Sequence, residues 1–467
     1  MNSEGRAVFC FTHDLRVADN AALCRALSQE DSLACVYCFD PRWLQPNRYQ
    51  LSPLGQHRYQ FLYACLSELD WHLRQYGHSL SVYMMSPIEM YWRLYCDSDV
   101  RRVYGSINAG LDEQRDWQWL RDLDGMTVTQ VHTHTLFSAK QLSFSVEGAS
   151  DELVASHQAS SLATCLANLP KTFSTFRRRV DDAGIPIHAP LGEPDDWPLT
   201  NIASAWPLDA QGVDGLAIPE TNGEPLFHGG SAAGLAHIHH YFSGDWASCY
   251  KETRNALDEP LHSTRFSPWL AAGAVSPHRI WHLLKHYENT HGANESTEWI
   301  AVELLWREYF QWYAHKQGVR MFAPRGLTGR LPGSFYPERF QRWCHGNTPY
   351  PIVNACMHQL QTTGYLSNRG RQIAASCCIH ELGLDWRYGA AWFEQQLVDY
   401  DVASNWGNWQ YIAGVGANPR GAHHFDLQKQ ADLYDPSGVY TAAWNGHMGA
   451  DQLDAVDAAD WPVMPER

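Results

Sequence analysis

The chain has 467 residues, 45% of them hydrophobic and 18% charged, which indicates two or three globular domains and excludes a lone binding module or a disordered chain. Its apolar runs are short and interrupted by charge, so we expect no membrane-spanning helix, no secretory signal and a cytoplasmic location. The formal charge of −16 argues against nucleic-acid binding over the whole surface. However, residues 181–224 hold nine acidic residues and no Lys or Arg, whereas residues 300–420 hold 11 basic and eight acidic ones, so the C-terminal half is predicted to be locally basic.

The first part of the chain alternates between strand and helix patterns. Runs typical of buried strands lie at 7–11, 33–39, 79–84, 100–105 and 126–131. Helix-period segments lie between them, most clearly at 55–76. This alternation predicts an α/β domain over residues 1–140 that is built on a doubly wound parallel sheet. The first strand is followed by FTHDLR, not by the G-x-G-x-x-G of a dinucleotide-binding turn.

The rest of the chain divides into three segments. Residues 141–228 are rich in Pro, Gly, Ser and Asp, and we expect an interdomain connector with one helix near 173–180. Residues 229–444 lose the strand pattern and are predicted to form an all-helical domain, with helices near 232–241, 277–287, 296–316, 351–362, 369–382 and 388–397. Residues 445–467 form an acidic, aperiodic tail that we expect to be poorly ordered.

Two of the predicted helices carry polar side chains that a packed core does not need. Glu303 and Arg307 stand four residues apart beside Trp306, which is typical of an ion pair at a helix rim. Asn368 and Arg371 stand three residues apart, which is typical of a helix cap followed by a solvated basic turn. Ligand binding is the alternative interpretation of both pairs.

A third segment, DYDVASNWGNWQY, favours ligand binding. Asp401, Asn405 and Trp409 recur every four residues just after Asp399, and such carboxylates and carboxamides are costly to bury without a partner. A flavin needs donors and acceptors along its pyrimidine edge, apolar walls, and a cation such as Arg371 near its reduced form. Hydroxyl groups that suit a pyrophosphate precede another predicted helix, at Ser263, Thr264 and Ser267.

Longer motifs connect these residues. The runs GNTPYPIVNACMHQLQTTGYLSNRGRQIAAS and DWRYGAAWFEQQLVDYDVASNWGNWQYIAGVGANPR resemble the photolyase/cryptochrome family. The forms SNRGR and NWGNWQYIAGVG are similar to those of its DASH-type cryptochromes. Further matches are THDLRVADN, FDPR, YKETRN and KQADLYDPSGVY, so the resemblance spans residues 6 to about 444.

The resemblance implies an α/β antenna domain followed by a helical domain that binds FAD, with a folate (methenyltetrahydrofolate) as an optional antenna that contacts Glu113. Contacts to the FAD phosphates and ribityl chain are implied at Tyr250, Ser263, Thr264, Arg265, Phe266 and Ser267. Isoalloxazine contacts are implied at Arg307, Asn368, Arg371, Asp399, Asp401 and Asn405. Within that set Asn405 faces the central reducible nitrogen. Glu303 and Trp306 are implied to line the substrate pocket, where a protonated Glu303 donates a hydrogen bond to a thymine carbonyl.

DASH members of the family act mainly on cyclobutane pyrimidine dimers in single-stranded DNA, where no duplex pairing is broken to expose the lesion. Tyr411 stands where duplex-repairing relatives carry a second lesion-stacking Trp, which favours this substrate. The resemblance therefore predicts light-driven dimer repair by electron transfer from excited, reduced FAD. The alternatives are a blue-light photoreceptor with weak or no repair and a flavin-bearing nucleic-acid binder; no protein partner is implied. Repair of the (6-4) photoproduct is not expected, because Ser367 and Asn368 replace the paired histidines of that chemistry.

The sequence departs from the family in two places. The family carries electrons to FAD through three tryptophans; Trp409 and Trp386 match the first two, but Gly333 aligns with the third. We expect either Tyr336 or Trp343 to replace the third tryptophan, or the chain of donors to end at Trp386. The first-strand motif reads THDLR where relatives have RNDLR, which leaves the details of the antenna domain open.

Overall fold

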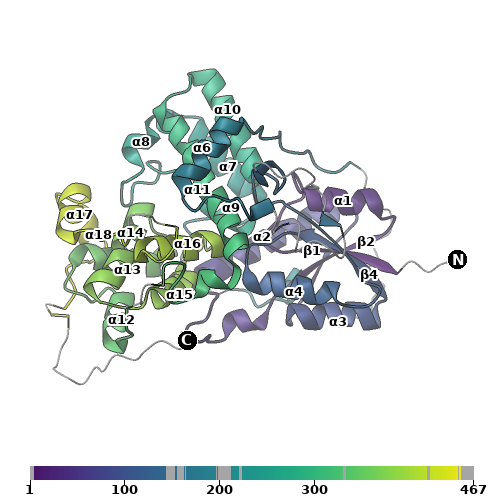
Figure 1. Ribbon diagram of the computed structural model, residues 1–467, viewed down its shortest axis with the longest axis horizontal. Helices are drawn as coiled ribbons and strands as arrows, with labels where there is room; N and C mark the ends of the chain where they lie inside the picture. Colours follow the sequence, from purple (N-terminus) through teal and green to yellow (C-terminus); the bar gives the residue numbers. More distant parts are fainter. Residues whose placement is uncertain are drawn as a thin grey trace.

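The computed structural model describes residues 5–143, 153–154, 162, 165–195, 197, 212–219, 223–329, 333–417, 421–450 and 452–453. Figure 1 shows a sheet with its helices at one side of the molecule and a larger group of helices at the other. The order of elements confirms the predicted fold class, an α/β part followed by an all-helical part.

A six-stranded sheet lies at the centre of the N-terminal part, in the order β3-β2-β1-β4-β5-β6. Its strands are β1 (Arg6–Phe11), β2 (Leu33–Cys38), β3 (Leu80–Tyr83), β4 (Val100–Ser106), β5 (Thr127–Val131) and β6 (Leu153–Val154). The first five pair in parallel, and their ends lie within one residue of the predicted ends. The short β6 pairs antiparallel with β5 and lies in the segment that was predicted to be a connector.

Helices cover both faces of this sheet, as a doubly wound arrangement requires. Along β1, Phe9 and Phe11 belong to one buried cluster, while Val8 and Cys10 belong to a second one on the opposite face. The first cluster includes residues of α1 (Ala21–Gln29) and α2 (Gln56–Gln75), and the second includes residues of α3 (Pro87–Asp97) and α4 (Leu111–Arg121). The strand and helix patterns of the sequence therefore place the core on both sides of β1.

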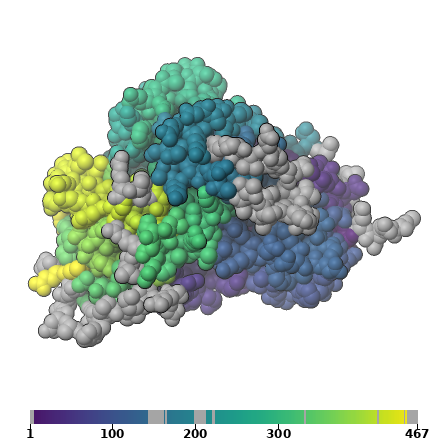
Figure 2. Space-filling view, in the orientation of Figure 1, coloured from purple at the N-terminus to yellow at the C-terminus, as the bar shows by residue number. Residues whose placement is uncertain are grey.

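The connector contributes the predicted helix, α6 (Phe173–Ala183). The Phe173 ring stacks on Trp306 of the helical part, with ring centroids 3.8 Å apart. Further along, the Trp197 indole stacks on Tyr76 of the α/β part, with centroids 4.6 Å apart. The described connector residues thus lie against both parts of the chain, and Figure 2 shows α6 on the molecular surface between them.

The C-terminal part is helical. Its α-helices are α7 (Ser231–Phe242), α8 (Tyr250–Thr253), α9 (Ser267–Ala272), α10 (Pro277–His291), α11 (Glu295–Gln317), α12 (Pro337–Cys344), α13 (Pro351–Thr363), α14 (Asn368–Ser376), α15 (Trp386–Gln396), α16 (Val402–Ala413), α17 (Leu427–Tyr434) and α18 (Val439–Ala443). The helix predicted over 369–382 is α14 followed by a π-helical turn, Cys377–Glu381. The other five helices named from the sequence correspond to α7, α10, α11, α13 and α15.

Buried polar contacts fix the two parts against each other. Glu308 of α11 accepts hydrogen bonds from the backbone N–H groups of Leu136 (2.7 Å) and Phe137 (3.2 Å), which follow β5. At the end of α9, Gly273 has a φ of 67°, and a Cβ there would lie 1.7 Å from the carbonyl oxygen of His13. Because only glycine permits this approach, the loop after β1 packs directly on α9.

The start of the predicted tail is structured. The Nδ2 of Asn354 donates to the carbonyl oxygen of Gly446 (3.1 Å), which holds this segment against α13. Residues 454–467 lie outside the described residues, so the prediction for the rest of the tail stays a prediction. No helix within the described ranges is long and apolar enough to cross a membrane.

Candidate functional site

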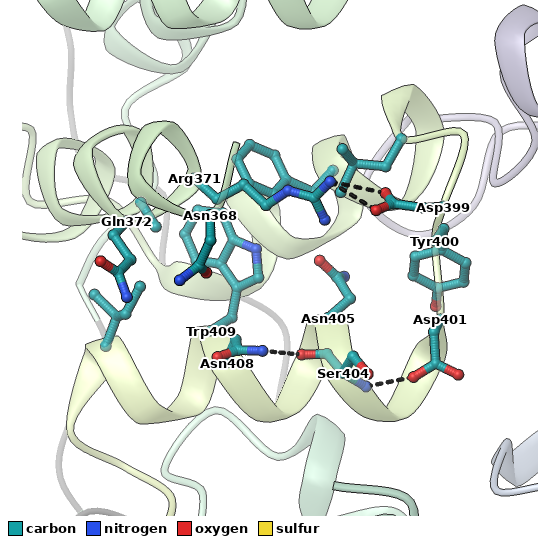
Figure 3. Close-up of a pocket in the computed structure, with 14 residues that line it drawn as sticks. Asn368, Arg371, Gln372, Asp399, Tyr400, Asp401, Ser404, Asn405, Asn408 and Trp409 are labelled. Carbon is teal, nitrogen blue, oxygen red and sulfur yellow. Dashed lines mark hydrogen bonds and ion pairs between the residues drawn. The ribbon is translucent and has the colours of Figure 1, made fainter. Parts of the chain in front are cut away.

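A cavity lies among α14, α15 and α16. Six of the residues predicted to contact an isoalloxazine ring or to donate electrons to it line this cavity, namely Asn368, Arg371, Asp399, Asp401, Asn405 and Trp409. Figure 3 shows these side chains around one space, with those of α14 facing those of α16.

One side of the cavity carries a buried ion pair. The Nη2 of Arg371 donates to both carboxylate oxygens of Asp399, at 2.9 and 2.8 Å, and its Nε donates to the carbonyl oxygen of Leu366 (2.9 Å). Burial alone would lower the pKa of Arg371, but the Asp399 carboxylate and the Tyr365 phenol outweigh it and raise the pKa. Arg371 therefore presents a fixed positive charge, which suits the anionic form of a reduced flavin.

The facing helix, α16, supplies a carboxylate and a carboxamide. Asp401 caps this helix by accepting from the backbone N–H of Ser404 (2.7 Å), and it also accepts from Nε2 of Gln311 (2.8 Å). The Nδ2 of Asn405 donates to the carbonyl oxygen of Ala390 (3.0 Å), so its amide orientation is fixed from outside the cavity. In Figure 3 the Asn405 side chain points into the cavity, toward Arg371.

An indole forms part of the apolar wall. Trp409 is 2% exposed, and its ring meets those of Phe393 and Trp343 edge to face, at 5.1 and 6.1 Å. On the neighbouring helix α15, a Cβ at Gly389 would lie 2.3 Å from Cη2 of Trp409. Glycine at this position therefore makes room for the indole beside the cavity.

The segment predicted to bind the FAD phosphates lies outside the cavity lining and adjoins it through Tyr365. The guanidinium groups of Arg265 and Arg371 both lie 5.3 Å from the centre of the Tyr365 ring. Ser263 is also a hydrogen-bond partner of Tyr365. Of the remaining residues of this predicted set, Tyr250 and Phe266 are buried. The backbone carbonyl oxygen of Thr264 is hydrogen-bonded to His237, and Ser267 begins α9.

Glu303 has a different ion-pair partner from the one that the sequence suggested. Its Oε1 accepts from Nη1 of Arg254, the residue after α8 (2.8 Å), and from Nε1 of Trp299 (3.1 Å). Arg307 instead donates through Nη1 to the carbonyl oxygen of His134 (2.5 Å) and through Nη2 to that of Leu270 (3.4 Å). The Glu303–Arg307 ion pair suggested by the sequence was therefore wrong, because spacing along one helix does not show which group from another element is nearer. Arg307 is not among the residues that line the cavity, and its contact with a flavin stays a prediction.

Trp306 lies one turn along α11 from Glu303 and contacts aromatic rings of other elements. Trp306 is partly exposed and meets the ring of Tyr411 edge to face at 5.9 Å. His423, in the segment between α16 and α17, stacks on Tyr411 with centroids 4.6 Å apart. Burial raises the pKa of Glu303, although Arg254 and Trp299 oppose this effect. A carboxyl group with a raised pKa thus lies on the same helix as a partly exposed indole.

The electron-transfer residues are only partly arranged as predicted. Trp386 begins α15 and is 1% exposed, with Nε1 donating to the carbonyl oxygen of Pro324 (3.1 Å). Trp343 is fully buried and contacts Trp409, so it does not lie at a surface end of the chain of donors. Tyr336 packs on Arg339, whose guanidinium lies 4.5 Å from the ring centre.

The predicted folate contact, Glu113, lies on α4. Its Oε1 is 3.3 Å from Nε2 of His13. His13 is one of the two residues of the THDLR motif that depart from the family pattern, with Thr12 the other. One of the two departures therefore contacts this carboxylate directly.

Several residues of the site were missed from the sequence. Tyr400, Gln372, Ser404 and Asn408 also line the cavity. Tyr400 lies between two predicted aspartates, and Ser404 and Asn408 flank Asn405, so the dense polar run around α16 was a usable signal. Tyr365 and Gln311 come from separate elements, and nothing in their local sequence distinguished them from core residues.

Comparisons with known proteins match both parts of the chain. Residues 7–194 match the DNA photolyase family model, and residues 299–457 match the model for the FAD binding domain of DNA photolyase. The Cryptochrome DASH of Idiomarina loihiensis is 44% identical over 98% of this chain and 96% of its own length, and that of Vibrio parahaemolyticus is 44% identical over 98% of both chains.

A solved structure of a Synechocystis cryptochrome is similar with a TM-score of 0.83 and 33% identity, covering 94% of this chain and 88% of that one. An archaeal photolyase of Sulfolobus tokodaii, whose structure is described with two FAD molecules, has a TM-score of 0.73 and 25% identity over 94% of this chain and 90% of its own. The fold, the FAD-binding domain and the full-length similarity together show that the chain belongs to the photolyase/cryptochrome family, among its DASH cryptochromes.

Proposed function

We propose that the protein repairs cyclobutane pyrimidine dimers in single-stranded DNA in a light-dependent reaction. The observation that carries this proposal is the partly buried Glu303 carboxyl group, which precedes Trp306 by three residues on α11, where the Trp306 ring meets that of Tyr411. A protein that only senses light has no need of a carboxyl group with a raised pKa at this place.

The bonds of Glu303 leave one oxygen for a substrate. Both partners among the described residues, Arg254 and Trp299, bind Oε1. Because burial raises the pKa of this carboxyl group, Oε2 is able to carry a proton and donate it in a hydrogen bond to a pyrimidine carbonyl. Such a bond is strengthened when the carbonyl oxygen gains negative charge, which favours electron uptake by the dimer.

The cavity residues supply the cofactor environment for this reaction. Arg371 with Asp399 holds a positive charge, Asn405 offers a carboxamide, and Trp409 forms a wall, which together match the polar edge and the apolar faces of a flavin. The chemistry that bound, reduced FAD supplies under light is the donation of one electron to the dimer. The chain's own residues orient the cofactor, hold its charge and bind the lesion.

Exposed basic residues border the aromatic end of the site. Arg320 and Arg325 lie on the segment after α11, and Leu327 of this segment donates its backbone N–H to the carbonyl oxygen of Val415 (2.7 Å). Val415 follows Tyr411 by four residues, so the segment that carries these arginines contacts the chain just beyond Tyr411. They suit the phosphates of a flexible single strand.

The proposal includes a folate antenna at Glu113. The carboxylate is 34% exposed and paired with His13, so a folate ring that binds there must share or replace this contact. An absorption band in the purified protein that is lost with Glu113→Gln would support the antenna.

The decisive experiment measures dimer repair in irradiated oligothymidine. The protein, chemically reduced and illuminated with near-ultraviolet light, is expected to restore the absorbance of intact thymines, whereas protein kept in the dark does not. The same assay on duplex DNA is expected to give slower repair. Absence of repair by protein that binds FAD and is fully reduced would contradict the proposal and would favour a photoreceptor role.

A further inference from the structure

At Gly333, the position of the family's third tryptophan, this chain has no room for a larger side chain. Ser334 forms a parallel β-bridge with Leu384, which brings Gly333 close to the residues before Trp386. A Cβ at Gly333 would lie 2.3 Å from the carbonyl oxygen of Gly383, so no larger side chain fits without moving the backbone. A donor that follows Trp386 must therefore lie elsewhere around its indole.

Trp406 of α16 occupies such a position. Its ring meets that of Trp386 edge to face, with centroids 5.7 Å apart, and both indoles are buried. The Nε1–H of Trp406 donates to the hydroxyl oxygen of Tyr400 (3.1 Å). The contacts thus run without interruption from Trp386 through Trp406 to a phenol.

The surroundings of Tyr400 suit a tyrosine that loses an electron and a proton together. Glu394 of α15 is a hydrogen-bond partner of Tyr400, and the guanidinium of Arg58 from α2 lies 4.6 Å from the centre of the Tyr400 ring. Burial raises the pKa of Tyr400 well above its ordinary value, so the phenol does not ionise on its own. Burial also raises the pKa of Glu394 to about 7, which makes it a stronger base than an ordinary carboxylate.

We propose that Trp406 and Tyr400 replace the missing third tryptophan, with Tyr400 as the terminal electron donor and Glu394 as the acceptor of its proton. The proposal deepens the proposed function and rests on it for the role of FAD. In the terminal step Tyr400 gives one electron to oxidised Trp406, which becomes a neutral indole again. The phenolic O–H bond breaks, and an O–H bond forms on the Glu394 carboxylate. An external thiolate then gives one electron to the neutral tyrosyl radical, and Glu394 returns the proton.

The first test is electron paramagnetic resonance of the illuminated FAD-loaded protein, together with the rate of flavin photoreduction by an external thiol. The wild type is expected to show a neutral tyrosyl radical. Trp406→Phe and Tyr400→Phe are expected to lose this signal and to photoreduce more slowly, with FAD content checked for each variant because Tyr400 lines the cavity. Tyr336→Phe serves as the matched control and is expected to keep the signal.

The second test uses the proton acceptor. Glu394 faces Arg58 of α2, Tyr400, and the carboxylates Glu113 and Asp112 of α4. Since a carboxyl group with a pKa of about 7 is ionised about tenfold more at pH 8 than at pH 6, the photoreduction rate is expected to rise about tenfold over this range. Glu394→Gln is expected to abolish the rise and to lower the rate at pH 8.

Three results would overturn the relay. The first is a wild type without a tyrosyl radical, and the second is an unchanged radical and rate in Trp406→Phe. The third is loss of the signal in Tyr49→Phe but not in Tyr400→Phe, since the Tyr49 ring also lies 6.3 Å from Trp406. Dimer repair by chemically reduced wild type bypasses the relay, so failure of that assay would contradict the proposed function and leave the relay result standing.

Discussion

The buried ion pair at the cavity offers a quantitative test of the site. In Asp399→Asn the side chain keeps its shape but loses its charge, which leaves the Arg371 guanidinium without a counter-ion. Removal of one partner from a buried pair costs about 3–5 kcal/mol. Because the Asp399 side chain is 1% exposed, the pair falls within this class, and because Arg371 is 26% exposed we expect the lower end. A loss of about 3 kcal/mol raises the unfolding equilibrium constant roughly a hundredfold.

The chain contains a matched control for this variant. Asp385 and Arg387 also form a buried ion pair, with a 2.8 Å contact and side chains 0% and 3% exposed, but neither residue lines the cavity. Asp385→Asn is expected to lose at least as much stability as Asp399→Asn and to keep its FAD affinity, whereas Asp399→Asn is expected to lose both. Urea unfolding followed by tryptophan fluorescence measures stability, and the recovery of free-flavin fluorescence measures FAD release. Wild-type FAD affinity in Asp399→Asn would refute the assignment of this pair to the cofactor.

Three further predictions follow from the same contacts. Asn405→Leu removes the carboxamide that faces the cavity and is expected to make bound FAD harder to reduce, as measured by its midpoint potential; an unchanged potential would argue against the contact. Glu303→Gln keeps a hydrogen-bond donor and is expected to retain more repair than Glu303→Ala, with wild-type repair falling as pH rises through the raised pKa of this acid, because the protonated form is lost. A full-rate Ala variant would show that Glu303 only pairs with Arg254. Binding to single-stranded, dimer-containing DNA is expected to weaken steeply with salt, and Arg320→Ala combined with Arg325→Ala to lower that salt dependence in a fluorescence titration.

The sequence predicted the fold well because periodicity reports which faces are buried. A local pattern marks each of the five parallel strands and helix α2, and the pattern predicts their ends to within a residue or two. The antiparallel β6 was not predicted, since two residues are too few to show an alternation. The π-helical turn after α14 was missed for a similar reason, because the apolar pattern through Cys377 and Cys378 fits an uninterrupted α-helix equally well.

The site was predictable where its residues belong to one segment. Asp401, Asn405 and Trp409 share a helix face, and the structure places all three at one cavity. Their partners across the cavity could be named only through the family resemblance, because sequence spacing gives no distance between helices. Arg307 shows the consequence: it stands four residues from Glu303, yet it binds the carbonyl oxygen of His134 from the other part of the chain.

The replacement for the missing tryptophan shows the same difference between sequence distance and spatial distance. Tyr336 and Trp343 were considered because they follow Gly333 in sequence, but electron transfer depends on the separation of rings. Trp406 is 73 positions from Gly333 in sequence, and α16 brings its ring to within 5.7 Å of that of Trp386. Because α16 also carries Asn405 and Trp409, one helix would hold the flavin contact, the first indole and the third. A backbone that closes one route beside Trp386 thus leaves another, through side chains that the cofactor site already holds in place.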